Sequence, residues 1–434
     1  LDPARYCHLL QSTVPGPQAR FDILFAYPED TLSLTSEAKL CGAQAGETDF
    51  LAALDDVWAA ARVRPNEPCE LPFRGGWFLY LSYELAGQIE PRLQLPSSSV
   101  PSPIALATRF RSAVIRDHQL DCLWLVTEAG TDERLDTLER DIACAKGAPQ
   151  RPLPSLPALT LTEDDPQQYL DIVRRTLRYI RDGDVFQANL ARSWRGHFAG
   201  PTAPASVYRR LRARNPGPFN GLATWPGHAI ISSSPERLVR VRGQVIDTRP
   251  IAGTRPRGQG AEADAELSRE LLAHPKERAE HIMLIDLERN DLGRICVPGT
   301  VRVDELMVLE SCAHGHHIGS NVGGELRAGI TPGAVIRAVF PGGTITGCPK
   351  VRCMEIIAEL EGRSRDAYTG AIGYLNRDGD LDLNILIRTV EQRGEQIELR
   401  AGAGIVADSD PERELAETRA KARGMLLALG YDGE

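Results

Sequence analysis

Strand-like runs that follow one another irregularly restrict the fold of this chain more than any other feature. In the second half, such runs occupy 219–225, 229–241, 244–254, 300–310, 314–326, 368–375, 382–392 and 397–407. Runs of this composition between turn residues are typical of β-strands. Helical patterns at 49–62, 166–182 and 203–215 are interposed without the regular βαβ alternation of a doubly wound sheet. The pattern therefore predicts an α+β fold.

The composition is that of a globular chain, and it excludes several classes of function. Of the 434 residues, 42% are hydrophobic and 25% are charged. A net charge of −9 and the lack of a basic stripe argue against binding to nucleic acid. No apolar run approaches the roughly 20 residues that span a membrane, and we find no signal peptide. The nine cysteines include no CxxC pair, which favours a reduced, cytoplasmic protein over a zinc ribbon.

A proline-rich stretch at 148–162 is the best candidate for a boundary. We therefore expect an N-terminal region at 1–150 and a second region at 164–430. The first region has strand-like and helical runs but no cluster of candidate catalytic or binding residues, so it is interpreted as scaffold or interface. The candidate catalytic residues all fall in the second region.

Two segments place glutamates on one face of an expected helix. Pro275 marks a helix start, because a proline in the first turn loses no needed hydrogen bond. Glu277 and Glu280 follow three residues apart, and Glu414 and Glu417 repeat this spacing far downstream. If the two faces met, they would offer the oxygen ligands that magnesium prefers. Taken alone, each pair is more often a solvated helix face.

Three further signals are weak when each is taken singly. The stretch 340–350 resembles a phosphate loop but lacks the GK[ST] ending, although its glycines expose amides suited to an anion. The run 402–407 matches a dinucleotide pattern, but no strand follows it to supply a ribose-binding acid. Gly402 and Gly404 can instead let backbone amides approach a carboxylate. Arg388, in an otherwise apolar strand, needs a partner such as an anionic ligand.

Taken together, five segments resemble a single family. They are PIAGTRPRG at 250–258, KERAEHIMLIDLERNDLGR at 276–294, FPGGTITGCPKVRCMEII at 340–357, YTGAIGY at 368–374 and AGAGIVADSDPERELAET at 401–418. The set resembles the chorismate-utilising enzymes, among them anthranilate synthase component I, aminodeoxychorismate synthase component I and the isochorismate and salicylate synthases. The resemblance implies chorismate as substrate. It also implies one large body of two packed, mainly antiparallel sheets flanked by helices.

The resemblance assigns metal and acid–base roles to matching positions. Glu280 and Glu414 resemble the direct ligands of Mg2+, and Glu277 and Glu417 resemble residues that hold metal-bound water. Glu236 matches the general acid that protonates the departing C4 hydroxyl. His317 and Thr254 complete the expected catalytic set, together with Gln187.

The remaining positions implied by the resemblance bind the substrate. Those that resemble the pyruvyl-carboxylate site are Tyr368, Arg388, Gly402, Gly404 and Lys421. Those that line the pocket are Ala252, Gly253 and Thr344. A fixed guanidinium such as that of Arg388 suits a planar carboxylate.

Position 187 narrows the reaction that the resemblance implies. Isochorismate and salicylate synthases carry a lysine there, which activates water. Gln187 cannot act as a base, so ammonia is the expected nucleophile. The chain has no recognisable Cys-His-Glu set of its own, and a separate glutamine amidotransferase subunit is the implied source of ammonia.

Two aminating members remain, and the motifs divide between them. Ala252 stands in PIAGT where aminodeoxychorismate synthases often carry a lysine, which favours anthranilate synthase. The segment 8–28, with its Arg-Phe-Asp-Ile strand, resembles the start of aminodeoxychorismate synthase instead. The segments SSSPERL and DTRPIAGT at 232–238 and 247–254 point the same way, as does NPGPFNG at 215–221 in place of NPSPYMF. We favour aminodeoxychorismate synthase component I.

Overall fold

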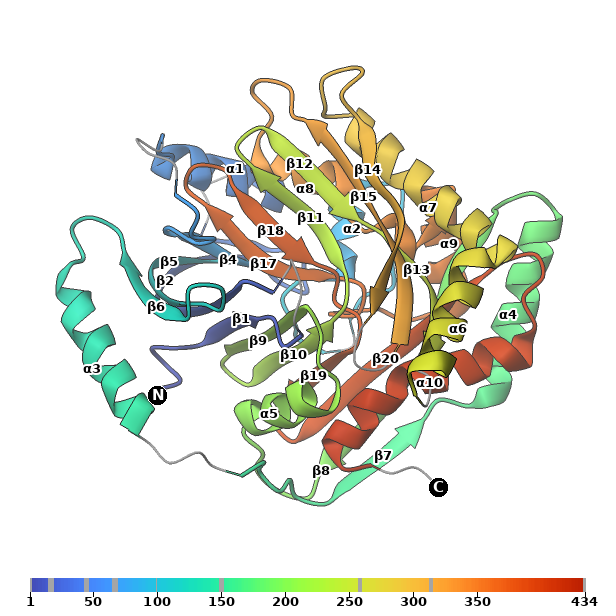
Figure 1. Ribbon diagram of the computed structural model, residues 1–434, viewed down its shortest axis with the longest axis horizontal. Helices are drawn as coiled ribbons and strands as arrows, with labels where there is room; N and C mark the ends of the chain where they lie inside the picture. Colours follow the sequence, from blue (N-terminus) through green and yellow to red (C-terminus); the bar gives the residue numbers. More distant parts are fainter. Residues whose placement is uncertain are drawn as a thin grey trace.

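The computed structural model describes residues 2–14, 19–42, 47–64, 69–98, 100–147, 152–256, 260–311 and 315–431. One continuous antiparallel ladder folds at β2 into two packed sheets, and Figure 1 shows them with helices outside. The first sheet runs in the order β2 (Phe21–Leu34), β5 (Ala105–Asp117), β4 (Gly76–Leu81), β17 (Ala371–Asn376), β18 (Leu381–Asn384), β11 (Arg237–Arg242), β12 (Val245–Arg249) and β15 (Gly315–Glu325). At its end, β13 (Ile251–Pro256) and β14 (Arg302–Ser311) both pair with β15.

The second sheet begins where β1 (His8–Gln11) pairs with β2. It continues through β9 (Phe219–Trp225), β10 (His228–Ser234), β19 (Thr389–Arg393), β20 (Gln396–Ile405) and β8 (Gln187–Phe198). Short strands β7 (Leu159–Glu163) and β16 (Gly347–Cys348) pair with β8, β3 (Leu40–Cys41) pairs with β2, and β6 (Cys122–Thr127) pairs with β5. Every strand pair in the described ranges is antiparallel, as expected for a mixed fold without βαβ units.

The inner faces of the two sheets pack on an aromatic core. Phe25, Phe78 and Phe110 of the first sheet are fully buried together with Ala223 and Ile230 of the second. The rings of Phe25 and Phe78 meet edge to face with centroids 5.4 Å apart, a geometry that aromatic quadrupoles favour. The predicted α+β fold of two packed sheets is thereby confirmed.

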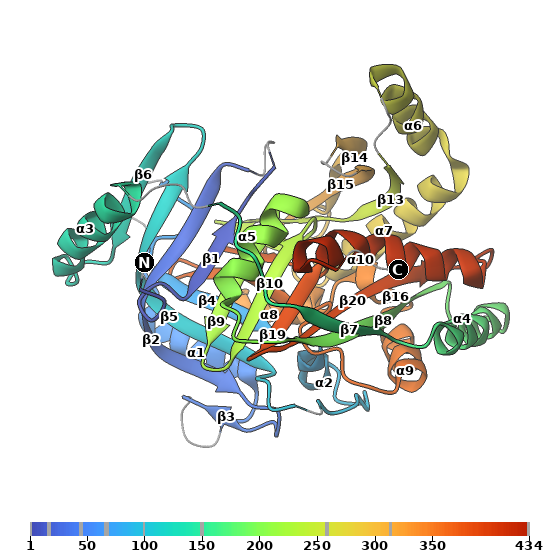
Figure 2. The same ribbon diagram turned by 90° about the horizontal axis from the view of Figure 1, so that it is seen from below.

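Helices cover the outer faces, as Figure 2 shows from below. Helices α5 (Pro204–Arg214), α10 (Pro411–Leu429), α4 (Pro166–Arg181) and α9 (Lys350–Glu361) lie over the second sheet. Helices α1 (Phe50–Ala61), α7 (Pro275–Gly293) and α8 (Pro332–Val339) lie against the first sheet. The others are α2 (Ala86–Ile89), α3 (Glu133–Gly147) and α6 (Ala261–Ala273), with single turns η1 (Tyr83–Leu85) and η2 (Gly343–Ile345).

Local sequence signals place the helix starts where they were expected. Helix α7 begins with Pro275 in its first turn, and Glu277 adds a negative charge there, which complements the helix dipole. Helix α1 begins after Asp49, whose side chain accepts a hydrogen bond from the amide of Ala52. The expected helices at 49–62, 166–182 and 203–215 correspond to α1, α4 and α5.

Strand pairs also cross between the N-terminal third and the remainder of the chain. Strand β1 pairs with β9, and β4 pairs with β17 along six residues from Gly76 to Leu81. The hydrogen-bonded sheets therefore include residues from both sides of the proline-rich stretch. Among the described residues, no helix is both long enough and apolar enough to cross a membrane.

Candidate active site

Strand β20 organises the site because its two faces have opposite character. Ala401, Ala403 and Ile405 pack against the covering helices. Side chains alternate between the faces of a strand, so Gly402 and Gly404 face the interior between the sheets. A Cβ on Gly402 would lie 2.7 Å from the Tyr368 hydroxyl, and one on Gly404 would lie 2.3 Å from Gln187 Nε2. A Cβ on Gly402 would also lie 2.6 Å from the Leu190 carbonyl, so glycine is required there, whereas a Cβ on Gly404 would displace the end of the Gln187 side chain.

The backbone of β20 offers two amides along an open edge. The amides of Asn189 and Ala191 in β8 donate away from β20, to the Thr346 carbonyl and to Glu361 Oε1. These residues lie opposite Gly404 and Gly402, so both are non-hydrogen-bonded pairs of the antiparallel ladder. The amides of the two glycines consequently point away from β8. Among the described strands, β19 pairs with β20 only as far as Leu399, and the edge beyond it is open.

Two cations lie close to this edge. Lys421 of α10 donates from Nζ to the Gly402 carbonyl at 3.0 Å and pairs with Glu417 at 2.7 Å. Arg388 immediately precedes β19, next to the last residue pair that joins β19 to β20, Val390 and Leu399. Its backbone has a positive φ of 51°. Amides and cations together form a site for an anion. The residues predicted to bind a carboxylate are thus brought together from β20, α10 and the start of β19.

Glu236 is a buried carboxyl group in the connection between β10 and β11. It is 5% exposed, and the Thr344 hydroxyl donates to its Oε1 at 2.6 Å. Burial raises the pKa of Glu236 to about 7, against the opposing effects of the Thr344 hydrogen bond and the charges of Lys421 and Arg388. The group is therefore about half protonated at neutral pH. A carboxylic acid of this kind can donate a proton to a bound molecule.

His317 on β15 is a buried, neutral ring close enough to the same two cations to be influenced by their charge. Its Nδ1 lies 3.2 Å from the Gly253 carbonyl, which can only accept, so Nδ1 carries the proton. Burial, together with the charges of Arg388 and Lys421, lowers the pKa of His317 to about 4. The ring is neutral at pH 7, and its Nε2 is a hydrogen-bond acceptor.

Strand β13 connects the histidine to the glutamate-bearing helix α7. Gly253 has a positive φ of 61°, and a Cβ there would lie 2.8 Å from Glu277 Oε2. Ala252 is paired with Ile318 of β15. The side chain of Thr254 lies outside the described residues, so its predicted role stays a prediction.

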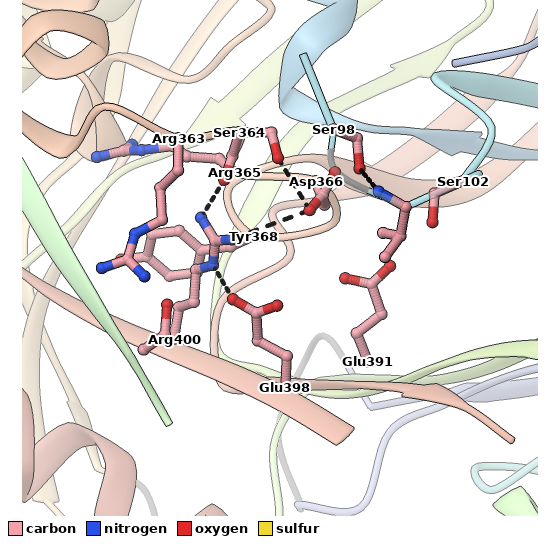
Figure 3. Close-up of polar contacts among 12 residues, drawn as sticks. Ser98, Ser102, Arg363, Ser364, Arg365, Asp366, Tyr368, Glu391, Glu398 and Arg400 are labelled. Carbon is pink, nitrogen blue, oxygen red and sulfur yellow. Dashed lines mark hydrogen bonds and ion pairs between the residues drawn. The ribbon is translucent and has the colours of Figure 1, made fainter. Parts of the chain in front are cut away.

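Figure 3 shows the polar network that fixes the segment carrying Tyr368. Arg400 of β20 donates to the Ser364 carbonyl, contacts Asp366 at 3.9 Å and pairs with Glu398 at 2.8 Å. Tyr368 is buried, which raises its pKa to about 12 and keeps its hydroxyl protonated. Arg400 is two residues from Gly402, so this network holds Tyr368 against the glycine face of β20.

Two buried groups near the site were not found by sequence reasoning. Glu288 of α7 is 5% exposed, and burial beside Asp291 raises its pKa to about 8. Lys350 pairs with Asp291. Arg365 is fully buried and pairs with Glu361. No local signal marks either residue, because Glu288 lies in a helix with many charged residues and Arg365 lies in the loop between α9 and β17 beside other charged residues.

The four glutamates predicted to bind metal come from the N-terminal parts of α7 and α10, with Glu277 and Glu414 in the first turns and Glu280 and Glu417 one turn later. Glu414 is buried, and Glu417 pairs with Lys421. Carboxylate oxygens are the ligands that Mg2+ prefers, so these residue types fit the ion. Glu277 Oε2 lies 2.8 Å from where a Cβ at position 253 would be, so the glycine there makes room for this carboxylate. Among the described residues, no group of three or more His, Cys, Asp or Glu is close enough to hold a metal ion. The metal remains a prediction.

Comparison with known proteins identifies the family. A family model described as chorismate binding enzyme matches residues 8–427. The chain is 45% identical over 366 residues to the anthranilate synthase component I-like protein of Synechocystis sp., which covers 84% of this chain and 74% of that protein. It is 43% identical over 407 residues to aminodeoxychorismate synthase component 1 of Bacillus subtilis, which covers 89% and 84%.

A solved structure extends the likeness to three dimensions. The crystal structure of anthranilate synthase component I from Streptococcus pneumoniae matches with a TM-score of 0.82 at 31% identity, over 95% of this chain and 93% of that one. The match spans both sheets. This chain belongs to the chorismate binding enzyme family and is an enzyme that acts on chorismate.

Proposed function

We propose that the chain is an aminodeoxychorismate synthase component I, which converts chorismate and ammonia to 4-amino-4-deoxychorismate. The observation that best supports amination is that residue 187 is a glutamine, whose side-chain amide is buried in the site. An amide cannot take a proton from water, so a nucleophile that needs no general base is favoured. Ammonia meets this requirement because it has a free lone pair. A separate glutamine amidotransferase subunit would supply it.

The charged groups of the site support a division of roles. The amides of Gly402 and Gly404, with Lys421 and Arg388, would hold the pyruvyl carboxylate at the open edge of β20. The Tyr368 hydroxyl would donate to the same carboxylate. Glu236, with its raised pKa, would give its proton to the leaving C4 hydroxyl. Neutral His317 would accept a hydrogen bond from the substrate at Nε2.

Magnesium is part of the proposal on the strength of the donor chemistry and the family resemblance. Glu280 and Glu414 would hold the ion directly, and Glu277 and Glu417 would hold its water. Such an ion would stabilise charge on the ring carboxylate of chorismate as a Lewis acid.

Amination at C4 rests on the N-terminal motifs and on similarity to the Bacillus subtilis protein. The Arg-Phe-Asp-Ile sequence consists of Arg20 and the first three residues of β2, Phe21, Asp22 and Ile23. Anthranilate formation is the second candidate, and Ala252 favours it. With an alanine at this position, no covalent lysine adduct can form there, so ammonia or another nucleophile would attack the ring directly.

A product assay distinguishes the two candidates. The pure chain is incubated with chorismate, magnesium and ammonium, and the products are separated with and without a lyase that releases 4-aminobenzoate. We expect 4-aminobenzoate only when the lyase is present. Anthranilate and stoichiometric pyruvate without the lyase would make the chain an anthranilate synthase, and turnover of neither kind would contradict both proposals.

A substitution at Gln187 tests the choice of nucleophile. We expect Gln187→Lys to produce isochorismate from chorismate in the absence of ammonium, because a buried lysine can act as a base toward water. Chromatography of the products at zero ammonium is the measurement. Gln392→Lys, at a buried glutamine of β19 that donates to the Thr202 carbonyl at 2.6 Å, is the control and should give no isochorismate. If the Gln187 variant folds and binds chorismate but forms none, the assigned role is wrong.

A further inference from the structure

Two amide oxygens on β8 are buried without a hydrogen-bond partner among the described residues. They are Gln187 Oε1 and Asn189 Oδ1. The two residues are 6% and 8% exposed and lie two positions apart, so their side chains share one face of the strand. A buried acceptor left without a donor is unfavourable, and native structures keep few of them. Two at adjacent positions indicate that a donor molecule binds here.

Both residues reach the glycine face of β20, Asn189 with its Oδ1 beside Gly402 and Gln187 with the end of its side chain beside Gly404. A Cβ on Gly402 would lie 2.8 Å from Asn189 Oδ1 and 2.7 Å from the Tyr368 hydroxyl. The position that this Cβ would occupy is thus within 3 Å of both groups. It lies on β20, whose open edge carries the amides of Gly402 and Gly404. The main chain of Asn189 is fixed from two sides, because its amide donates to Thr346 and its carbonyl accepts from Arg365 Nη2 at 2.7 Å.

The chemistry of these groups restricts the ligand. Carbonyl oxygens only accept hydrogen bonds, and they repel a carboxylate. The anionic part of the substrate is matched by Lys421, Arg388 and the glycine amides, which are donors or cations. The amide oxygens therefore match a group that is rich in N–H or O–H rather than a carboxylate. Ammonia has three N–H groups and keeps its lone pair when two of them are donated.

We propose that Asn189 and Gln187 together bind the ammonia nucleophile, with one N–H donated to each amide oxygen. This inference rests on the proposed amination and adds Asn189 as a second residue that positions the nucleophile. The nitrogen lone pair forms the new C–N bond while the ring C–O bond breaks, and its electron pair goes to oxygen. Glu236 gives the proton with which that oxygen leaves as water. The nitrogen then loses one proton, which restores the acid.

Steady-state kinetics with ammonium chloride as the nitrogen source tests this site. We expect Asn189→Leu to raise the KM for ammonium about tenfold, the effect of one lost hydrogen bond. The KM for chorismate should stay within twofold, because leucine leaves the carboxylate site intact. Asn189→Ala gives the same comparison if leucine disturbs folding. The Gln187→Leu and double variants should show that the two effects on ammonium are coupled.

Ser193→Ala is the matched control, since Ser193 is a buried residue on the same face of β8, four positions further along. Its KM for ammonium should equal that of the unchanged chain. An unaltered KM for ammonium in both Asn189 variants would overturn the inference and leave structural water as the donor. An equal rise in the KM for chorismate would also overturn it, because Asn189 would then face the substrate. Failure of the unchanged chain to use ammonium would instead refute the proposed function.

Discussion

Replacing Glu236 with glutamine is expected to lower kcat/KM for chorismate about 10³-fold, the usual contribution of a general acid. Glutamine keeps the size of the side chain and can still contact Thr344, so the loss is one of proton donation. In the unchanged chain, kcat/KM should fall tenfold per pH unit above about pH 7. The reason is that burial raises the pKa of Glu236 to about 7 and only the protonated form is active.

The pH profile of the variant provides the decisive measurement. The residual rate of Glu236→Gln should be flat from pH 6 to 9, because the titrating group is gone. Glu84→Gln is a suitable control, since burial also raises the pKa of Glu84, to about 8, and its Oε1 accepts from the Arg365 amide at 2.7 Å rather than from Thr344. It should stay within a few-fold of the unchanged chain and keep the decline above pH 7. A Glu236 variant with the same decline would assign the proton to another group.

Replacing Arg365 with leucine is expected to reduce the free energy of unfolding by about 3–5 kcal/mol, because it leaves a buried charge without its partner. Arg365 pairs with Glu361 at 2.6 Å and donates to the carbonyls of Asn189 and Ile345 at 2.7 and 3.2 Å. The substitution would leave the Glu361 carboxylate without this cation, and the two carbonyl oxygens without this hydrogen-bond donor, in the interior. The shift of the urea midpoint, followed by circular dichroism, is the measurement.

Two further variants distinguish the effect of breaking the buried ion pair from the general effect of removing an arginine. Arg175→Leu removes a partner of Glu359 from a pair whose side chains are 43% and 46% exposed, and it should cost less than about 1 kcal/mol. Arg365→Leu combined with Glu361→Leu should recover part of the stability, because no unpaired charge remains. A midpoint for Arg365→Leu equal to that of Arg175→Leu would contradict the structural role of the buried pair.

Several features of the site could be predicted because their causes are local. Pro275 begins α7, since a proline at the first turn needs no amide donor. Gly402 and Gly404 were expected to expose amides, and the strand register places those amides on an open edge. Gln187 was identified through the family resemblance, since isochorismate and salicylate synthases carry a lysine at this position and a glutamine cannot act as a base.

Other features depend on contacts between distant residues, and no short segment encodes them. Asn189 shows no special pattern in the sequence, and only the approach of Gly402 and Tyr368 places its oxygen in the site. Glu288 and Arg365 look like ordinary charged residues until their burial is known. The pKa of Glu236 likewise follows from burial between β10 and η2 rather than from its neighbours in sequence.

The sequence by itself therefore determined the class of fold, the starts of the helices and the residue types available for acid, anion and nucleophile chemistry. Propensity, capping and side-chain chemistry act within a few residues, so they can be read from a segment. The tertiary structure alone decided which strands pair, which edge of β20 stays open and which carboxyl groups lose water. These depend on contacts between residues as distant in sequence as Glu236 and Thr344, because solvent is excluded only once the sheets have assembled.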